Sequence, residues 1–344
     1  MKHLTILVPD AQTGPNTLSC IVGAYHIFTE ANNHYQRQNK NPVFTIELAG
    51  VSPQADFVNG LLTVMPQKDI ATLQHTDLVI IPAIRAGFSK PDSGNQLLVS
   101  WIREQYKTGA ELASMCSGAY LLAATGLLDH RNCSLHWNAV DHFRTLFPKV
   151  ILKAEQLITD EQGIYTNGGG YSFLNLILYL VEKFYDRQTA IYCSKVFQIE
   201  IDRHTQSNFA IFNGQKMHDD ELIKKAQEYI EQHFQDKISF EDLSRKFAVG
   251  RRNFDRRFIK ATGNTPVVYW QRVKIESAKK LLETSRKTVN EVMYEVGYTD
   301  IKAFREVFRK ISCLSPTAYK GRYNKGSTSA WHQHQAPPPN TERY

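Results

Sequence analysis

The segment FDRRFIKATGNTPVVY, residues 254–269, recurs as FREVFRKISCLSPTAY at residues 304–319. The two copies align without a gap at a shift of 50 residues, and five positions are identical: two Phe, one Lys, one Pro and one Tyr. A repeat of this kind indicates two copies of one supersecondary unit. We therefore expect residues 221–323, where apolar residues recur at helical spacing, to form an all-helical domain with two similar halves.

Each copy belongs to the same local pattern. An S-x-x-D motif at 239–242 and a T-x-x-E motif at 288–291 each predict the capped start of a helix. A tight turn follows, at 248–250 and at 297–300, and then a second helix that contains the phenylalanines of the repeat. Helix, tight turn, helix is the pattern of a helix-turn-helix unit, which the chain contains twice.

The second helix of each unit is predicted to have two different faces. Its two phenylalanines lie four residues apart and are expected to pack inward. The other face carries Arg251, Arg252, Arg256, Arg257 and Lys260 in the first unit and Lys302, Arg305, Arg309 and Lys310 in the second. A basic helix after a tight turn fits the major groove of DNA, where Arg and Lys reach guanine edges and phosphates. The alternative is a basic face that contacts only solvent.

The charge of the chain is concentrated in the same region. The net charge is +7, and residues 217–323 hold 22 Lys and Arg against 15 Asp and Glu. Residues 1–216 are close to neutral, with 17 basic and 18 acidic side chains. An anionic partner would therefore meet the last third of the chain.

The first two hundred residues alternate between strand-like and helix-like segments. Short β-branched runs occur at 4–9, 43–50, 77–84, 110–115 and 163–169, helical stretches occur at 18–31, 94–107, 117–125 and 172–184, and one more helix is expected at 185–204. This alternation predicts an α/β domain with an open, mostly parallel sheet and helices on both faces. In such sheets ligands bind at the carboxyl ends of the strands.

Cys116 stands at one of these strand ends, in the segment ELASMCSGAYLLAATGLL at 111–128. A thiol at a helix N-terminus is expected to be exposed and to have a lowered pKa, because the first-turn amides stabilise the thiolate. The chain has 5 cysteines, scattered without a C-x-x-C pair. This usage is typical of a reducing cytoplasm and argues against a disulfide framework and a structural zinc site.

Residues 218–323 resemble the DNA-binding domain of the AraC/XylS family of transcriptional regulators. The resemblance is carried by the central helix VVYWQRVKIESAKKLL and by EVMYEVGYTDIKAFREVFRKISCLSPTAY. It implies a sequence-specific DNA-binding regulator. The DNA-contact candidates are Arg251, Arg252, Arg256, Lys302, Arg305 and Arg309, and among them Arg252 and Arg256 are the best base readers.

Two positions depart from the AraC/XylS pattern. Cys313 stands where the family usually has Gly, and Glu306 stands where the second recognition helix usually has Arg. A carboxylate can accept a hydrogen bond from a cytosine amino group, or it can weaken the contact with DNA. The resemblance therefore supports base reading by the first unit more strongly than by the second.

Residues 4–200 resemble the PfpI superfamily, which has a class I glutamine amidotransferase-like, flavodoxin-like fold and which occurs in some AraC-type regulators as the amino-terminal domain. The resemblance is carried by ELASMCSGAYLLAATGLLDHRNCSLHW at 111–137 and by TNGGGYSFLNLILYLVE at 166–182. It implies a ligand pocket, for which the candidate residues are Cys116, Ser117, His136 and Gly169.

Hydrolytic members of that superfamily use the equivalent cysteine as a nucleophile, with a histidine base and a carboxylate. His136 is the candidate base. In PDAQTGPNTLSCIVGAYHIF, residues 9–28, the family's acidic position falls near Cys20, and Asp10 comes too early in the segment. Because the catalytic set is incomplete, we expect a pocket that senses a small-molecule effector. An enzyme that uses Cys116 as its nucleophile is the alternative.

The expected organisation is a sensor domain at 1–204, a linker at 205–217, a DNA-binding domain at 218–323 and a disordered tail at 324–344. The expected partners are double-stranded operator DNA, a small-molecule effector, a second copy of the chain in a homodimer, and RNA polymerase. We expect no cofactor, no metal and no membrane contact, and a cytoplasmic location. A module that binds proteins instead of DNA is the other alternative.

Overall fold

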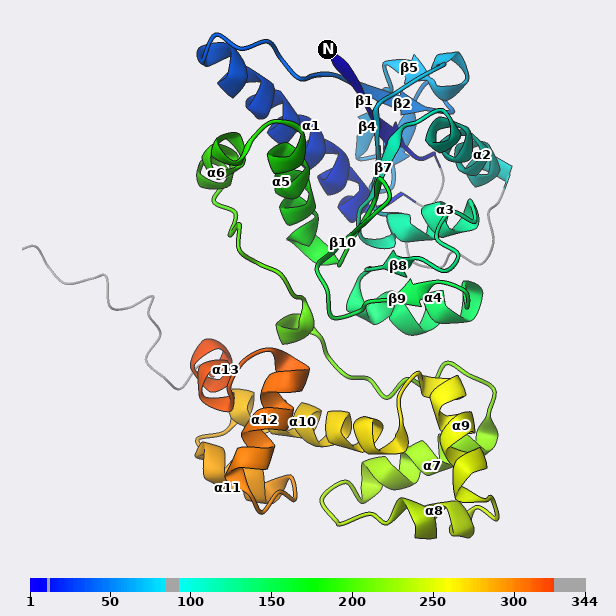
Figure 1. Ribbon diagram of the computed structural model, residues 1–344, viewed down its shortest axis with the longest axis vertical. Coiled ribbons are helices and arrows are strands. Elements are labelled where there is room, and N and C mark those ends of the chain that lie inside the picture. Colours follow the sequence, from blue (N-terminus) through cyan, green and yellow to red (C-terminus); the bar gives the residue numbers. More distant parts are fainter. Residues whose placement is uncertain (11–12, 85–92, 325–344) are drawn as a thin grey trace, which may run out of the picture. The chain divides into compact units, whose positions relative to one another are not determined.

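The computed structural model describes residues 1–10, 13–84 and 93–324. The chain divides into two compact units, Met1–Ser207 and Asn208–Tyr344 (Figure 1). The domain limits expected from the sequence, 1–204 and 218–323 with a linker between them, stay predictions. The expectation of a disordered tail falls almost wholly outside the described residues, which end at 324.

The N-terminal unit is built on a seven-stranded sheet. In the order β10-β11-β7-β6-β1-β2-β5, the strands span Ile158–Glu161, Ile164–Asn167, Glu111–Ser114, Leu78–Ile81, Lys2–Val8, Phe44–Gly50 and Lys68–Asp69. Every neighbouring pair is parallel except β10 and β11, which form an antiparallel hairpin at one edge. The predicted mostly parallel α/β sheet is confirmed.

Helices cover both faces of this sheet (Figure 1). The unit contains α1 (Pro15–Arg37), α2 (Ser93–Lys107), α3 (Ala119–Ala124), α4 (Val140–Leu146), α5 (Phe173–Phe184) and α6 (Arg187–Val196). Successive strand residues point to opposite faces. In β6, Leu78 and Ile80 therefore join the core formed with α1, α5 and α6, whereas Val79 and Ile81 join the core formed with α2, α3 and α4.

The differences from the predicted elements have local causes. The helix expected at 185–204 ends at Val196, because the chain turns at Gln198 with a φ of 54°. Short elements were missed because two to four residues are too few to show a periodicity; they include the pairs β3 (Ala55–Phe57) with β4 (Leu62–Val64) and β8 (Asn132–Cys133) with β9 (Ile151–Leu152). None of the helices in the described ranges is long and apolar enough to span a bilayer.

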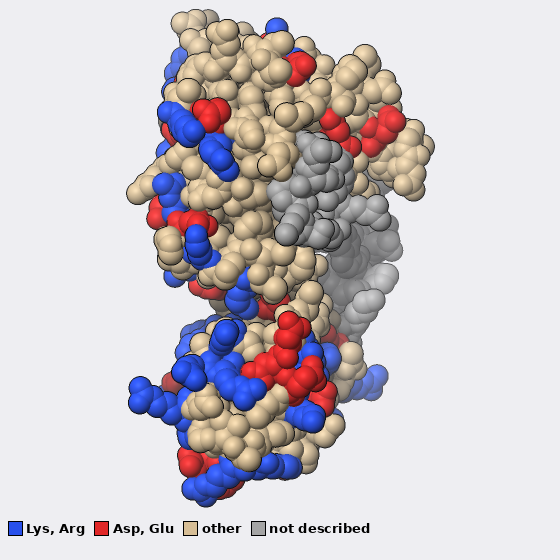
Figure 2. Space-filling view, turned by 90° about the vertical axis from the view of Figure 1, so that its right-hand side faces the viewer, with Lys and Arg blue, Asp and Glu red and all other residues tan. Residues whose placement is uncertain are grey.

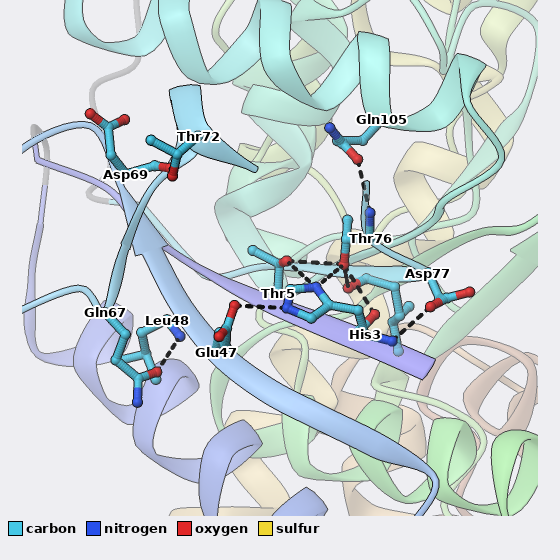
Figure 3. A network of polar contacts seen from close by, with 11 residues as sticks. His3, Thr5, Glu47, Leu48, Gln67, Asp69, Thr72, Thr76, Asp77 and Gln105 are labelled. Atoms are coloured by element: carbon cyan, nitrogen blue, oxygen red, sulfur yellow. Dashed lines mark hydrogen bonds and ion pairs between the residues drawn. The ribbon is translucent and has the colours of Figure 1, made fainter. Parts of the chain in front are cut away.

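A polar network ties the strands together near the amino ends of β1 and β2 (Figure 3). The ring of His3 lies 2.8 Å from a carboxylate oxygen of Glu47 through Nε2 and 3.1 Å from the hydroxyl of Thr76 through Nδ1. The backbone N–H of Thr76 donates to the side chain of Gln105 on α2 at 3.1 Å. Because the half-buried His3 and Glu47 and the buried Thr76 and Gln105 satisfy one another, this network stabilises the end of the sheet away from the carboxyl ends of the strands.

The C-terminal unit is all helical in the described residues. It contains α7 (Glu221–Gln232), α8 (Phe240–Lys246), α9 (Arg251–Thr262), α10 (Pro266–Thr284), α11 (Val289–Glu295), α12 (Ile301–Ser312) and α13 (Pro316–Tyr323). Two hydrophobic cores form around the two halves of the repeat, one with Phe254 and Phe258 and the other with Phe304 and Phe308. The long helix α10 contributes residues to both cores.

The predicted caps are present in both halves. The hydroxyl of Ser239 accepts from the backbone N–H of Asp242 at the start of α8. Thr288 and Glu291 form a reciprocal capping box at the start of α11. These bonds satisfy backbone donors that have no partner within the helix, and they set where each helix-turn-helix unit begins.

Candidate functional site

A sharp elbow joins β7 to α3 at the carboxyl edge of the sheet. Cys116 follows the strand with a φ of 53°, a left-handed conformation that is uncommon outside glycine. A Cβ atom on Gly118 would lie 2.6 Å from the carbonyl oxygens of both Ile81 and Pro82, so this position requires glycine. The local geometry is that of a nucleophile elbow, in which a strained turn presents one side chain above the sheet.

The environment of Cys116 differs from the one expected. Cys116 is only 8% exposed, and burial raises the pKa of its thiol. Hydrogen bonds from the backbone N–H groups of Gly170 and Ser117 favour the thiolate, but they do not offset the desolvation. The prediction of an exposed thiol with a lowered pKa is wrong, because strand ends and loops from other parts of the chain cover the elbow.

The cavity beside Cys116 is small. Its volume is about 10 Å³, and it is lined by Asn16, Ser19, Cys20, Ala83, Cys116, Gly170, Tyr171 and Phe173. Such a space holds about one water molecule. These lining residues include no carboxylate: α1 places Cys20 there, and burial raises the pKa of that thiol to about 12. Asp10 instead accepts a hydrogen bond from Ser52 at 2.8 Å.

His136 and Ser117 border the elbow without completing a catalytic set. The ring of His136 packs on Gly169, where a Cβ atom would lie 1.6 Å from the ring, and burial lowers the pKa of the imidazole. The hydroxyl of Ser117 donates to the carbonyl of Ile84 at 2.5 Å and accepts from its N–H at 3.1 Å. His136 is not among the residues that line the cavity at Cys116. The four predicted ligand-binding residues thus lie around the same strand ends, and their role stays a prediction.

The second helices of the two repeats present the basic surface of the C-terminal unit. In α9 and α12 the paired phenylalanines are fully buried, so the opposite faces point to solvent. The exposed basic residues are Arg252, Arg256 and Lys260 on α9 and Lys302, Arg305, Arg309 and Lys310 on α12. Figure 2 shows many Lys and Arg side chains on one face of this unit, together with a group of Asp and Glu side chains.

Ion pairs divide the arginines of α9 into two groups. Arg251 donates to both carboxylate oxygens of Asp255 at 2.9 Å, and Arg257 binds Asp220 with contacts of 2.6 and 2.8 Å. Arg252 is exposed, and Arg256, also exposed, donates to the amide oxygen of Asn253 at 3.0 Å. Of the predicted contacts on this helix, Arg252 and Arg256 are therefore better placed to reach DNA than Arg251.

A shallow groove of about 240 Å³ runs along the exposed face of α12. It is lined by Ile301, Lys302, Arg305, Glu306 and Arg309. The predicted contacts of the second unit, Lys302, Arg305 and Arg309, therefore share one surface with the acidic Glu306. Their spacing of three and four residues places them one above another along the helix.

The fold and these surfaces define a class of protein: a DNA-binding regulator with an α/β unit and a double helix-turn-helix unit. A model of the DJ-1/PfpI family matches residues 42–183, and a model described as a helix-turn-helix domain matches residues 243–322. The chain therefore joins a DJ-1/PfpI domain to an AraC-type helix-turn-helix domain, as the sequence motifs indicate.

Similar proteins include named transcriptional regulators. The chain is 26% identical over 247 residues to the HTH-type transcriptional regulator CdhR of Pseudomonas aeruginosa, covering 71% of this chain and 72% of that protein. It is 24% identical to the HTH-type transcriptional regulator GbdR of Pseudomonas aeruginosa, over 63% of this chain and 59% of that protein. A solved structure from Vibrio parahaemolyticus, named as a transcriptional regulator, is similar to this chain, with 21% identity, a TM-score of 0.50 and coverage of 57% of this chain and 98% of that one.

Sequence reasoning missed two aspects of the sites. Asn16 and Ser19, one turn of α1 apart, and Tyr171 line the cavity at Cys116. The helical spacing of Asn16, Ser19 and Cys20 was the available signal. The ion pair between Arg257 and Asp220 had no sequence signal, because the two residues lie 37 positions apart.

Proposed function

We propose that this regulator reads a specific operator sequence through α9 and α12 and that its N-terminal unit adjusts this activity in response to an effector. The observation that carries the proposal is the repeated geometry of the two helices. Each follows a tight turn, buries two phenylalanines and exposes a row of basic side chains at helical spacing. A helix of this kind enters the major groove, where its exposed Arg and Lys contact bases and phosphates.

The test measures binding of the full chain to duplex DNA selected from a random pool, over a range of salt concentrations. We expect a steep loss of affinity as salt rises, because binding releases counterions from the phosphates. Arg256→Ala should weaken binding by about 1–3 kcal/mol and relax the preference at one base position. Arg257→Ala, which removes an arginine held by Asp220, is the matched variant and should leave the base preference unchanged. Binding that ignores both sequence and salt would contradict the proposal.

For the N-terminal unit we propose sensing rather than catalysis. A cavity of about 10 Å³ is far below the ~300–1,000 Å³ of usual small-molecule sites, so an organic effector must open it. The raised pKa of the Cys116 thiol works against a nucleophilic mechanism, and so does a cavity lining that, among the described residues, contains no carboxylate. These features favour the ligand-sensing role of Cys116, Ser117, His136 and Gly169 over the enzyme alternative.

We also propose that the chain forms a homodimer through its N-terminal unit. A groove of about 340 Å³ between α1, β2 and β4 is lined by Ile21, Val22, Tyr25, His26, Thr29, Leu48 and Val64. Of these lining residues, Val22 is 55% and Tyr25 40% exposed. Apolar surface of this kind favours contact with a second copy, and a dimer gains affinity by binding two half-sites. We place this dimer in the cytoplasm. Bound to operator DNA there, it would contact RNA polymerase.

A further inference from the structure

Lys274 lies at the boundary between the two halves of the C-terminal unit. On its N-terminal side, α10 contributes Tyr269 to the first core, and on its C-terminal side it contributes Ile275 to the second. Lys274 itself is only 2% exposed, which is rare for a lysine. A buried cation on a helix that both halves share requires a structural explanation.

The contacts of Lys274 come from both halves. Its Nζ atom donates to the carbonyl oxygen of Gly297 at 2.9 Å, in the turn between α11 and α12. The same atom lies 4.2 Å from the centre of the Trp270 ring and 5.1 Å from that of Tyr298. Trp270 packs against the first core and Tyr298 against the second. The ammonium group is therefore held between an aromatic ring of each half.

The backbone is tightly packed around the same point. Gly297 has a φ of 73°, and a Cβ atom there would lie 1.9 Å from the carbonyl oxygen of Gln235, in the loop after α7. The indole N–H of Trp270 donates to the carbonyl of Phe234 at 2.9 Å, and the Phe234 ring packs against the second core. We call this set, Phe234, Gln235, Trp270, Lys274, Gly297 and Tyr298, the joint.

We infer that Lys274 is a positioning residue that holds α9 and α12 at one relative distance and angle, and that it thereby sets the spacing of the two DNA segments that the chain accepts. The inference rests on the proposed DNA reading by both helices. Major-groove segments on one face of a duplex repeat about every 10–10.5 base pairs. A change of one base pair shifts the second segment by about 3.4 Å and rotates it, so a rigid joint accepts one spacing and a loose joint accepts several.

A lysine suits this position because its contacts require both reach and charge. A long stem crosses the joint, and the ammonium group satisfies the Gly297 carbonyl while it contacts two rings. Methionine keeps the length and the apolar stem but removes the donor and the charge. Arginine keeps the donor and the charge.

The test uses the full chain and a duplex selected from a random pool by the unaltered protein. Duplexes with one base pair added or removed between the two contacted segments are then compared with the selected one. The unaltered protein should lose about tenfold or more in affinity on either duplex, as for a mismatched site. Lys274→Met should bind the selected duplex with an affinity similar to that of the unaltered protein, but it should lose only about twofold in affinity on the altered duplexes. Lys274→Arg should show the same loss on the altered duplexes as the unaltered protein.

Lys279→Met is the matched control. Lys279 is also buried on α10, but its Nζ atom donates to the carbonyl of Ala210 and to Glu276, outside the joint. It should keep the full penalty. Tyr298→Leu removes a ring of the joint from the second half and should relax spacing as Lys274→Met does, which keeps the test decisive if the methionine variant is unstable.

An unchanged spacing penalty in both Lys274→Met and Tyr298→Leu would overturn the inference while the proposed function stands. Failure of the unaltered protein to select any duplex would overturn the proposed function, and the inference with it. If Lys279→Met lost as little affinity on the altered duplexes as Lys274→Met, the inference about Lys274 would also be overturned, because the effect would then follow from the loss of any buried lysine.

Discussion

Cys116 combines a strained backbone with a protected thiol. Its left-handed φ matches an elbow built to present a side chain, whereas burial raises the pKa of the thiol and the cavity beside it holds about one water. The residue type and its place in the chain therefore do not determine its reactivity. Its reactivity is determined by the strand ends and the Gly168–Gly170 turn that enclose it.

We expect Cys116→Ala to leave the affinity for DNA without effector unchanged, since the recognition helices belong to the other unit. The variant should lose any change in DNA binding that an effector causes, because Cys116 lines the cavity. DNA binding before and after treatment checks this, with Cys133→Ala, a buried cysteine outside that cavity, as the control. Turnover of amides or small aldehydes that is lost in Cys116→Ala would show an enzyme instead.

Cys313 ends α12 in a conformation that suits glycine. Its φ is 59°, and the first repeat has Gly263 at the matching position with a φ of 72°. Cys313→Gly should raise the free energy of unfolding by about 0.5–1 kcal/mol, because glycine adopts the left-handed region without strain. Urea unfolding measures the change, and Gly263→Ala should lower stability by a similar amount. Equal or lower stability in Cys313→Gly would contradict this account of the cap.

At the scale of elements, α10 determines how the two helix-turn-helix units are joined. Its buried Lys274 has its pKa lowered from 10.5 to about 8, chiefly by desolvation, while Asp236 acts in the opposite direction. The folded state therefore binds fewer protons than the unfolded state between about pH 8 and 10.5. Burial of the charged ammonium destabilises the fold below pH 8, and this effect fades as the pH rises through that window.

We therefore expect the unaltered protein to gain stability relative to Lys274→Met as the pH is raised from about 7.5 to 10, by at most roughly 3 kcal/mol. Urea midpoints of the two proteins at several pH values measure the difference. A stability difference between Lys274→Met and the unaltered protein that is constant with pH would show that Lys274 does not titrate in this range.

At the scale of the whole molecule, assembly should depend on the apolar groove of the N-terminal unit. Val22→Glu places a charge beside that groove and should shift the full chain from dimer to monomer at micromolar concentration. Sedimentation equilibrium measures the shift. Ile151→Glu, at an exposed aliphatic residue on β9, is the control and should leave the mass unchanged. A monomeric unaltered protein, or a Val22→Glu chain that stays dimeric, would contradict the proposed interface.

The sequence by itself determined the class of each unit. Alternating strand and helix segments predict the mostly parallel sheet, and the repeat at a shift of 50 residues predicts two helix-turn-helix units. The caps at Ser239 and Thr288 and the inward phenylalanines also follow from local pattern. Periodicity, capping and charge are properties of neighbouring residues, so the order of residues along the chain contains them.

Only the tertiary structure decided what each chemical group can do. The pairing of Arg257 with Asp220, the enclosure of Cys116 by Gly170 and α1, and the place of Lys274 between Trp270 and Tyr298 all join residues far apart in sequence. Burial, cavity volume and pKa depend on the groups that long-range packing brings together, and no local pattern encodes them. For this reason the sequence indicated where DNA and a ligand would bind, and the fold decided which side chains are free to contact them.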